Sequence, residues 1–187
     1  MDQRGTVERA RQGDHDAFAV LVDVATARLD AAARLILRDP ELARDAVQEA
    51  LIRAWRDLPG LRDPDRFDAW LYRLTVNSCL DLARRRRRLP IEVDISPLDS
   101  PVATDTAGLL ADRELLDGAL RRLDPAHRAV VALHYLLEMP LHEVAASLGI
   151  PLGTVKSRLH YSLAAMRTTV EAEPDAAPAQ LAEGRPA

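Results

Sequence analysis

The stretch GTVKSRLHYSL, residues 153–163, places hydrogen-bonding side chains among apolar ones at helical intervals. Val155, Leu159 and Leu163 recur every four residues, so they line one face of a helix and turn it toward a core. The outer faces then carry six polar side chains, at Thr154, Lys156, Ser157, Arg158, His160 and Tyr161. Lysine and arginine bind phosphates and guanine edges, and hydroxyl groups bind phosphates, so this set has the chemistry of a DNA-reading surface.

The residues before this stretch have the organisation of a helix-turn-helix. In LHEVAASLGIP, Val144 and Leu148 fit a core, and Ala145 is small where two helices must cross closely. Gly149 suits the turn, because glycine adopts a positive φ without strain, and Ile150 returns the chain to the core. The pattern predicts a motif whose second helix enters the major groove of DNA. A helical hairpin with no nucleic-acid role is the alternative that the pattern leaves open.

The distribution of charge favours a DNA partner although the total does not. The 187-residue chain carries a formal net charge of −4, which argues weakly against nucleic-acid binding. Between residues 121 and 170, however, there are six basic side chains and three acidic ones, a balance of about +3. The local balance therefore supports the DNA-reading interpretation of the last third of the chain.

A second candidate surface lies on the helix predicted over RFDAWLYRLTVNSCLDLARRRRR, which ends at Arg88. Its predicted core face consists of Phe67, Trp70, Leu71, Leu74, Ser78 and Leu82, and its polar stripe of Arg73, Asn77, Asp81 and Arg84. Aromatic side chains such as Trp70 and Tyr72 beside a basic run can hold single-stranded bases, but at helical spacing they more often pack in a core. The arginine run from Arg84 fits either a phosphate contact or a solvated helix end, where the dipole favours cations.

The helix predicted over residues 41–56 is amphipathic, and Asp45, Gln48 and Glu49 gather on its polar side, as a solvated face or a docking face. No catalytic pattern accompanies them. The five histidines form no HExxH pair, and the chain has neither a Gly-rich phosphate loop nor a Gly-x-Ser-x-Gly turn. Cys79 lies among leucines and fits a small apolar filler better than a nucleophile. We therefore expect no enzyme, no metal and no cofactor.

Composition indicates an all-α fold in two parts. Hydrophobic residues make up 48% of the chain but aromatic residues only 4%, which favours helix over sheet. Periodic apolar residues occupy about 14–84 and 108–166, and the polar, proline-containing stretch between them reads as a linker. Asp39-Pro40 and Asp124-Pro125 are helix start signals. One cysteine, no secretory signal and no apolar run of membrane length favour a cytoplasmic location.

The chain resembles the extracytoplasmic-function (ECF) sigma factors of the bacterial sigma-70 family in the order and separation of its motifs. These are DAVQEALIRAW, RFDAWLYRLTVN, a Leu-Asp step with an arginine run, a polar linker, and LDPAHRAVVALHYLLEMPLHEVAASLGIPLGTVKSRL. The resemblance covers nearly all of residues 13–167 and implies two small helical domains joined by a flexible linker. The implied boundaries are 1–88 for sigma region two, 89–107 for the linker, 108–170 for sigma region four and 171–187 for a disordered acidic tail.

The resemblance also implies function. A protein of this family binds core RNA polymerase and directs it to promoters, so it is a transcription initiation factor and not an enzyme. An anti-sigma factor is implied as a second protein partner. Neither membrane insertion nor a small-molecule substrate is implied.

Particular residues receive roles from the resemblance. Docking on core polymerase is implied for Asp45, Gln48, Glu49 and Arg53. Recognition of the −10 element is implied for Asn77, which would meet a base flipped out of the melted strand, and for the backbone-binding Arg66, Arg73, Arg84 and Arg85. Recognition of the −35 element is implied for Thr154, Lys156, Ser157, Arg158, His160 and Tyr161. Tyr161 departs from the family, which usually has a basic residue there, so we expect fewer phosphate contacts and a shallower salt dependence, by about one unit of log–log slope per contact.

Two other functions stay open on the residues alone. A stand-alone helix-turn-helix regulator would explain residues 141–167 but would leave the aromatic helix from Phe67 without a purpose, and no dimerisation helix is evident. A helical adaptor that binds only protein would predict that Lys156→Ala combined with Arg158→Ala leaves any DNA association unchanged.

Overall fold

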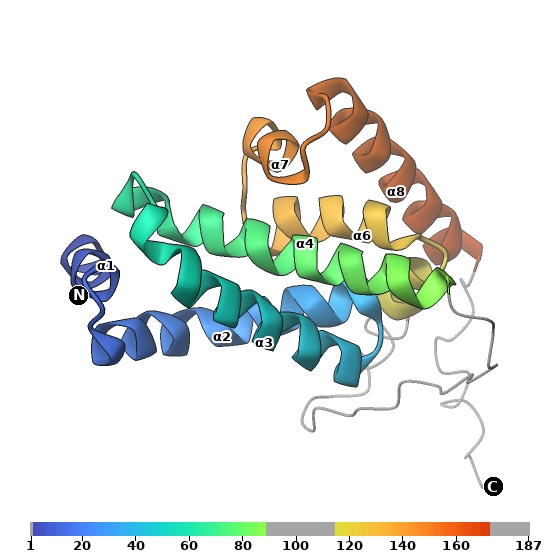
Figure 1. The fold of residues 1–187 in the computed structure, drawn as a ribbon. Coiled ribbons are helices and arrows are strands. Elements are labelled where there is room, and N and C mark those ends of the chain that lie inside the picture. Colours follow the sequence, from blue (N-terminus) through green and yellow to red (C-terminus); the bar gives the residue numbers. More distant parts are fainter. Residues whose placement is uncertain (1, 89–114, 173–187) are drawn as a thin grey trace, which may run out of the picture.

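The computed structural model describes residues 2–88 and 115–172, and all regular structure in these two ranges is helical (Figure 1). The first range contains α1 (Gln3–Arg11), α2 (His15–Leu37), α3 (Pro40–Asp57), the 3-10 turns η1 (Leu58–Gly60) and η2 (Pro64–Arg66), and α4 (Phe67–Arg88). The second contains a helical stretch over 115–121, α6 (Pro125–Val131), the π-helical turn η3 (Ala132–Leu136), α7 (Leu141–Leu148) and α8 (Leu152–Ala172). The all-α fold is confirmed. The predicted linker lies outside the described residues, as does the predicted tail beyond residue 172.

Aspartate side chains begin the main helices where the sequence predicts. The Asp39 carboxylate accepts hydrogen bonds from the backbone N–H groups of Glu41 and Leu42, both at 3.0 Å, and Pro40 occupies the first turn of α3. Asp124 caps α6 in the same way, accepting from the backbone N–H of His127 at 2.9 Å. Each cap satisfies backbone donors that the first turn of a helix leaves without a partner.

α1 is a helix that the sequence analysis does not predict. Val7 and Ala10 are buried against α2, and the first turn is tied to η2 and to the first turn of α4. Gln3 donates to Asp68 at 2.8 Å and Arg4 to Asp65 at 2.7 Å. These partners lie 65 and 61 residues away along the chain, so the local sequence contains no sign of them.

A stripe of alanines lets α3 lie close to both of its neighbours. Ala43, Ala46, Ala50 and Ala54 are fully buried where α3 packs against α2 and α4. Small side chains at this helical spacing let two backbones approach each other. The larger core side chains come from the other helices, among them Leu29, Ile36 and Phe67.

α4 is buried on a wider arc than the sequence predicts. Tyr72, Thr75, Val76 and Cys79 are buried, whereas Trp70, Leu74 and Leu82 of the predicted core face are only half-buried. The cause is that α4 has neighbours on two sides: it contacts α2 and α3 on one side and α6 and α7 on the other (Figure 1). A helix with two packed sides has no single apolar stripe.

The helix-turn-helix forms as predicted, except that Leu163, expected on the buried face of its second helix, is exposed. Gly149 ends α7 with φ +63°, in the left-handed region that favours glycine, and the backbone N–H of Ile150 donates to the Ala145 carbonyl at 3.1 Å. Val144 of α7 and Val155 of α8 are fully buried, and Leu159 is buried beside them. These apolar contacts fix α8 against α6 and α7 and turn its other faces outward.

The two halves of the chain share one hydrophobic core, which the sequence analysis does not predict. α2 contacts α6 and η3, and buried side chains from both halves belong to the same cluster. The Arg128 guanidinium donates from Nε to the Ile36 carbonyl at 2.7 Å and from Nη1 to the Leu123 carbonyl at 2.9 Å. Arg38 pairs with Asp117 across the same interface, with Nη1–Oδ1 at 2.7 Å and Nη2–Oδ2 at 2.8 Å.

Candidate nucleic-acid and protein interfaces

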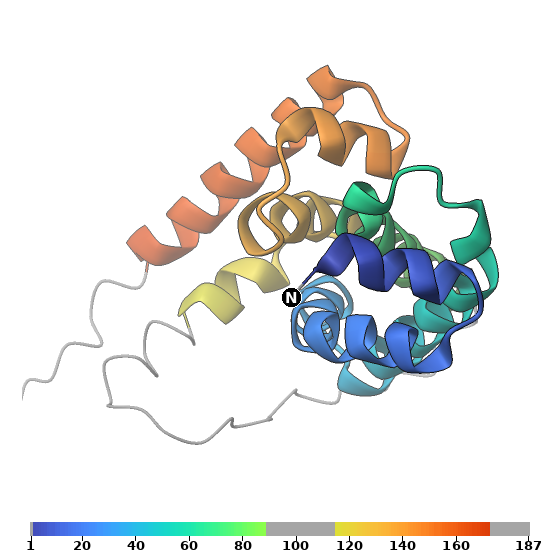
Figure 2. The ribbon, with the colours of Figure 1, turned by 90° about the vertical axis from the view of Figure 1, so that its left-hand side faces the viewer.

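The outer faces of α8 carry all six residues that the sequence nominates for duplex DNA. Lys156, Ser157, His160 and Tyr161 are exposed, while Thr154 and Arg158 are half-buried. Figure 2 shows α8 along one edge of the molecule, on the side opposite α1. The buried Val155 and Leu159 hold the helix in this orientation, so the six side chains form one accessible polar surface.

Three further residues, which the sequence does not nominate, adjoin this surface. Arg122, Asp124 and His127 line a pocket of about 440 Å³ together with Ser157, Arg158 and Tyr161. The rings of His127 and Tyr161 lie 4.9 Å apart between centroids, with their planes at 51°. The two residues are 34 positions apart, so helical periodicity could not reveal the contact.

The candidate −10 residues extend from η2, which contains Arg66, along α4 instead of forming one cluster. Arg66, Arg73, Arg84 and Arg85 are exposed and Asn77 is half-buried. At about 100° per residue, Arg73, Asn77 and Arg84 lie within about 40° of one another around the helix, whereas Arg85 is rotated by about 100° from Arg84. Arg73 and Arg85 are about 18 Å apart along the axis at about 1.5 Å per residue. This arrangement follows a strand better than it surrounds a small ligand.

Two aromatic residues are too deeply buried to stack on a base. Phe67 and Tyr72 lie in the core, and burial, the first of several causes, raises the pKa of the Tyr72 hydroxyl. Trp70 is half-buried, with its ring centroid 6.0 Å from that of Phe67. For Phe67 and Tyr72, the core interpretation left open by the sequence is the correct one.

The acidic patch on α3 is accessible, although one of its members is already paired. Asp45 and Gln48 are exposed, and Glu49 accepts a hydrogen bond from Arg53 one turn further along the helix. Arg53 and Glu49 are both partly buried, so the pair forms a fixed element of the α3 surface.

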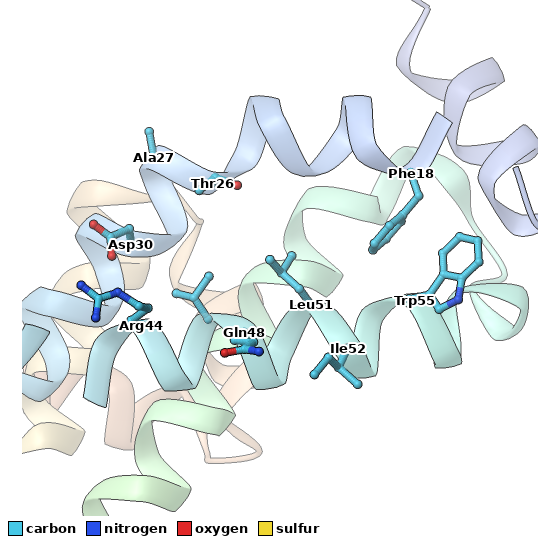
Figure 3. Close-up of a pocket in the computed structure, with 10 residues that line it drawn as sticks. Phe18, Thr26, Ala27, Asp30, Arg44, Gln48, Leu51, Ile52 and Trp55 are labelled. Carbon is cyan, nitrogen blue, oxygen red and sulfur yellow. The ribbon is translucent and has the colours of Figure 1, made fainter. Parts of the chain in front are cut away.

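Beside this patch, α2 and α3 enclose an apolar groove of about 600 Å³ that the sequence analysis does not predict (Figure 3). Phe18 on α2 and Leu51 and Trp55 on α3 form its apolar end, where the Trp55 ring lies 5.0 Å from that of Phe18. Asp30 and Arg44 lie at the other end. Ile52 lines this groove and is 61% exposed although it is a large apolar residue, which is the sign of an apolar contact surface here.

Neither a metal cluster nor a membrane-spanning helix is found in the part of the chain that the structure describes. Within residues 2–88 and 115–172, no group of three or more His, Cys, Asp or Glu side chains could hold a metal ion. Over the same residues, no helix is long and apolar enough to cross a bilayer.

Comparison with protein families matches both halves of the chain. Residues 24–89 match the family described as Sigma-70 region 2, and residues 119–168 match Sigma-70, region 4. A helical bundle followed by a helix-turn-helix with a polar outer face is thus the architecture of a sigma-70-type transcription factor. We use region 2 for the described residues through Arg88 and region 4 for those from residue 115 onward.

The relatives of the whole chain narrow this class. The chain is 37% identical over 139 residues to the RNA polymerase sigma-E factor of Streptomyces avermitilis, covering 74% of this chain and 76% of that protein. It is 37% identical over 136 residues to the ECF RNA polymerase sigma factor SigL of Mycobacterium tuberculosis, covering 71% and 77%. SigW of Bacillus subtilis is 28% identical over 179 residues, covering 86% and 92%. The chain belongs to the ECF RNA polymerase sigma factors, which are transcription initiation factors and not enzymes.

Solved structures give the same fold. CnrH, in complex with the cytosolic domain of CnrY, superposes with a TM-score of 0.67 at 27% identity, covering 91% of this chain and 98% of CnrH. The sigma factor RpoE of Bartonella quintana, in complex with the anti-sigma factor NepR, gives a TM-score of 0.65 at 22% identity, covering 82% and 96%. The second likeness bears on the fold alone.

Proposed function

We propose that this sigma factor reads its promoters in two parts, with α8 in the major groove of the −35 element and α4 along the melted −10 strand. The main support is the orientation of α8. Its apolar face is held in the core by Val155 and Leu159, and all six nominated polar side chains remain on the accessible faces. An exposed helix of this kind, following a tight turn, is the element that enters a major groove.

For the −10 element, we assign base capture to Asn77 and phosphate contacts to the arginines around it. Asn77 is half-buried, and a base that flips out needs a partly enclosed position with hydrogen-bonding groups. Arg73 and Arg84 share its side of α4, and Arg66 and Arg85 extend the basic track at either end.

For core polymerase, we assign docking to the exposed face of α3. Asp45, Gln48, Glu49 and Arg53 supply its polar contacts. The groove beside it adds apolar area at Leu51 and Ile52, so polar specificity and hydrophobic burial occur on one surface. Gln48 belongs to both, because it also lines the groove.

We also propose an anti-sigma factor as a regulatory partner, and action in the cytoplasm, where polymerase and the chromosome are found. The match to CnrH covers 91% of this chain, and the CnrH structure is that of a complex with the cytosolic domain of CnrY. A partner of this kind would compete with polymerase for exposed surface on region 2.

In vitro transcription tests the two-part assignment. The purified chain is mixed with core RNA polymerase and a library of genomic promoter fragments, and the transcripts are sequenced. We expect new start sites that depend on the chain and share two sequence elements. Asn77→Ala should reduce initiation and relax the preference at the −10 element, while Lys156→Ala with Arg158→Ala should weaken the −35 preference.

Each outcome bears on one part of the proposal. If no start site depends on both the chain and polymerase, the sigma activity is wrong. If Asn77→Ala leaves initiation and the −10 preference unchanged, base capture belongs to another residue. Binding of promoter fragments by the chain alone, with the same specificity, would favour a stand-alone regulator.

A further inference from the structure

The pocket between α6 and α8 combines residues from three segments of region 4. Arg122 comes from the turn before α6, Asp124 and His127 from the start of α6, and Ser157, Arg158 and Tyr161 from α8. Tyr161 lies four positions after Ser157 and three after Arg158, so it shares a side of the helix with each of them. We call this the α6–α8 pocket. The pocket has a volume of about 440 Å³ and lies beside the proposed DNA-reading faces of α8. A group of the DNA bound to α8 is therefore within its reach.

The hydrogen bonds of Asp124 determine which nitrogen of His127 is free. The Asp124 carboxylate lies 3.0 Å from His127 Nδ1 and also accepts from the His127 backbone N–H. Although burial opposes it, these hydrogen bonds hold the pKa of Asp124 below its ordinary value, so the carboxylate is charged at neutral pH. A carboxylate can only accept, so Nδ1 carries the hydrogen that faces Asp124, and Nε2 is the ring nitrogen that Asp124 does not contact. Among the described residues, Nε2 has no hydrogen-bond partner.

Tyr161 closes one side of the pocket by packing on His127. The ring centroids are 4.9 Å apart, and Tyr161 is 58% exposed whereas the His127 side chain is 22% exposed. A protonated imidazole is attracted by the face of an aromatic ring. His127 thus packs on Tyr161 and lines the same pocket.

The charge of the pocket depends on His127. Arg122 and Arg158 contribute two positive charges and Asp124 one negative charge, so protonation of His127 raises the net charge from about +1 to about +2. Arg128, the other charged residue at the start of α6, does not contribute because its Nη1 donates to the carbonyls of Leu120 and Leu123, at 3.4 Å and 2.9 Å, within region 4 itself. The pocket therefore selects an anion, and arginine, histidine and tyrosine are groups that contact DNA phosphates.

We propose that the α6–α8 pocket binds one backbone phosphate of the −35 DNA through Arg122, Arg158 and the protonated imidazole of His127. The inference rests on the proposed function of α8. Neutral His127 presents a lone pair at Nε2, whereas protonated His127 presents an N–H, so phosphate binding takes up one proton from solvent at this atom. The pocket also gives Tyr161, an uncharged residue on the proposed reading surface, charged neighbours: Arg122 and His127 come from the segment before α6 and from α6 itself.

The test measures promoter binding by holoenzyme formed from the full chain and core polymerase, using a fluorescent duplex that contains a promoter from the transcription assay. Anisotropy titrations are made at about pH 6 and about pH 8, on either side of the ordinary titration range of histidine. Uptake of one proton strengthens binding by at most about tenfold per pH unit, so we expect wild type to bind several-fold more tightly at pH 6. His127→Gln keeps a hydrogen-bond donor for Asp124 but cannot be protonated, so its affinity should change little with pH. Arg122→Ala should lower the log–log salt slope by about 0.9, the value for one phosphate contact.

Matched histidine variants separate the possible sources of pH dependence. His142 is exposed on α7 outside the pocket, so His142→Gln should behave like wild type. His160→Gln removes a proposed reading residue and should weaken binding while leaving the pH dependence in place. The inference is wrong if the pH dependence survives in His127→Gln, or if Arg122→Ala leaves the salt slope unchanged. If wild-type holoenzyme fails to bind at either pH, the proposed function itself is overturned, and this inference with it.

Discussion

At the scale of single residues, Cys79 shows how completely the interior of α4 is removed from water. The side chain is 0% exposed, and burial raises the pKa of its thiol to about 12. Only the thiolate reacts with alkylating reagents, and at about pH 8 a thiol with this pKa is ionised in roughly one molecule in ten thousand. Cys79 is therefore a structural residue of the core and a natural reporter of its opening.

We expect native protein at about pH 8 to be labelled by iodoacetamide at Cys79 far more slowly than protein in denaturant, where the thiol regains an ordinary pKa near 8.5. Labelling should be followed by mass spectrometry at increasing urea concentrations, and its rate should rise with the unfolded fraction. Denatured protein is the control for complete reaction. Rapid stoichiometric labelling without denaturant would contradict the burial of Cys79.

Ser78 is a second residue whose effect can be predicted from its surroundings. It is fully buried, and its Oγ has no hydrogen-bond partner among the described residues. Ser78→Ala removes this unpaired hydroxyl and adds a better helix former, so we expect the free energy of unfolding to rise by about 1 kcal/mol. Urea denaturation followed by circular dichroism measures the change.

Thr75 provides the matched comparison for Ser78. It is buried on the same helix, but its Oγ1 donates to the Leu71 carbonyl at 3.1 Å. Thr75→Val keeps the shape and loses this bond, so it should not stabilise the protein. If Ser78→Ala lowers the free energy of unfolding, the hydroxyl of Ser78 has a partner after all.

At the scale of elements, Asp39 links the start of α3 to the end of α4. Its carboxylate caps α3 and also accepts a hydrogen bond from Arg86 at 2.8 Å. We expect Asp39→Ala to lower the free energy of unfolding by about 1–2 kcal/mol, most of it from the lost cap. Asp39→Asn keeps the capping oxygen and removes only the charge, so it should recover most of the loss in thermal denaturation. Equal losses for both variants would mean that the ion pair, not the cap, is the larger contribution.

Features that depend on neighbouring residues in the chain can be predicted from sequence, and features that depend on distant residues cannot. Asp39-Pro40 and Gly149 were identified because each acts on backbone atoms a few residues away, so the signal is local. α1 has a local start signal, since the Asp2 carboxylate accepts from the Gly5 backbone N–H at 3.1 Å, but the polar contacts that hold α1 on the rest of the fold lie more than sixty residues distant, at Asp65 and Asp68. The buried arc of α4 was misjudged for the same reason, since its second set of neighbours comes from region 4.

The residues of the candidate site also fall into those that local sequence can predict and those that it cannot. Periodicity and the family resemblance nominated the outer faces of α8, because those residues follow one another on a single helix. They could not nominate His127 or Phe18, whose functional surroundings arise only when separate helices pack. Pockets between elements are a property of the tertiary structure, so one-dimensional patterns do not contain them.

At the scale of the whole molecule, the shared core conflicts with the proposed simultaneous reading of the −10 element by α4 and the −35 element by α8. The names −10 and −35 imply about 25 base pairs between the elements, or roughly 85 Å at about 3.4 Å per base pair. A compact body of this size has a radius of gyration of about 15 Å, which corresponds to roughly 40 Å across. α4 and α8 therefore cannot reach both elements while regions 2 and 4 remain packed together. We expect the interface between them to open when the promoter is bound.

Arg38 and Asp117 provide the means to test this opening. Arg38 is largely buried and pairs with Asp117 through two contacts across the interface, and its hydrogen bond is the main reason that the pKa of Asp117 is lowered. Arg38→Met keeps the aliphatic stem and loses the pair, at a cost of about 1 kcal/mol, which is about a fivefold shift toward the open form. Small-angle scattering of the free chain should then show a larger radius of gyration. Because the pKa of the Asp117 carboxyl is lowered in the packed form, its ionised form stabilises the interface at pH values above the ordinary pKa, near 3.9. This stabilisation is lost as the pH falls through the lowered pKa, so acid should loosen the wild-type interface as well.

Arg121 supplies the control because it contacts the same carboxylate without crossing the interface. It pairs with Asp117 at 2.8 Å from four residues further along the same helical stretch. Arg121→Met therefore removes a comparable charge and hydrogen bond from Asp117 but leaves Arg38 in place, so the radius of gyration should stay near that of wild type. Arg38→Met holoenzyme should also bind promoter DNA more tightly, because less free energy is spent on separating the regions. If both variants scatter alike and bind DNA alike, the Arg38–Asp117 pair does not hold regions 2 and 4 together.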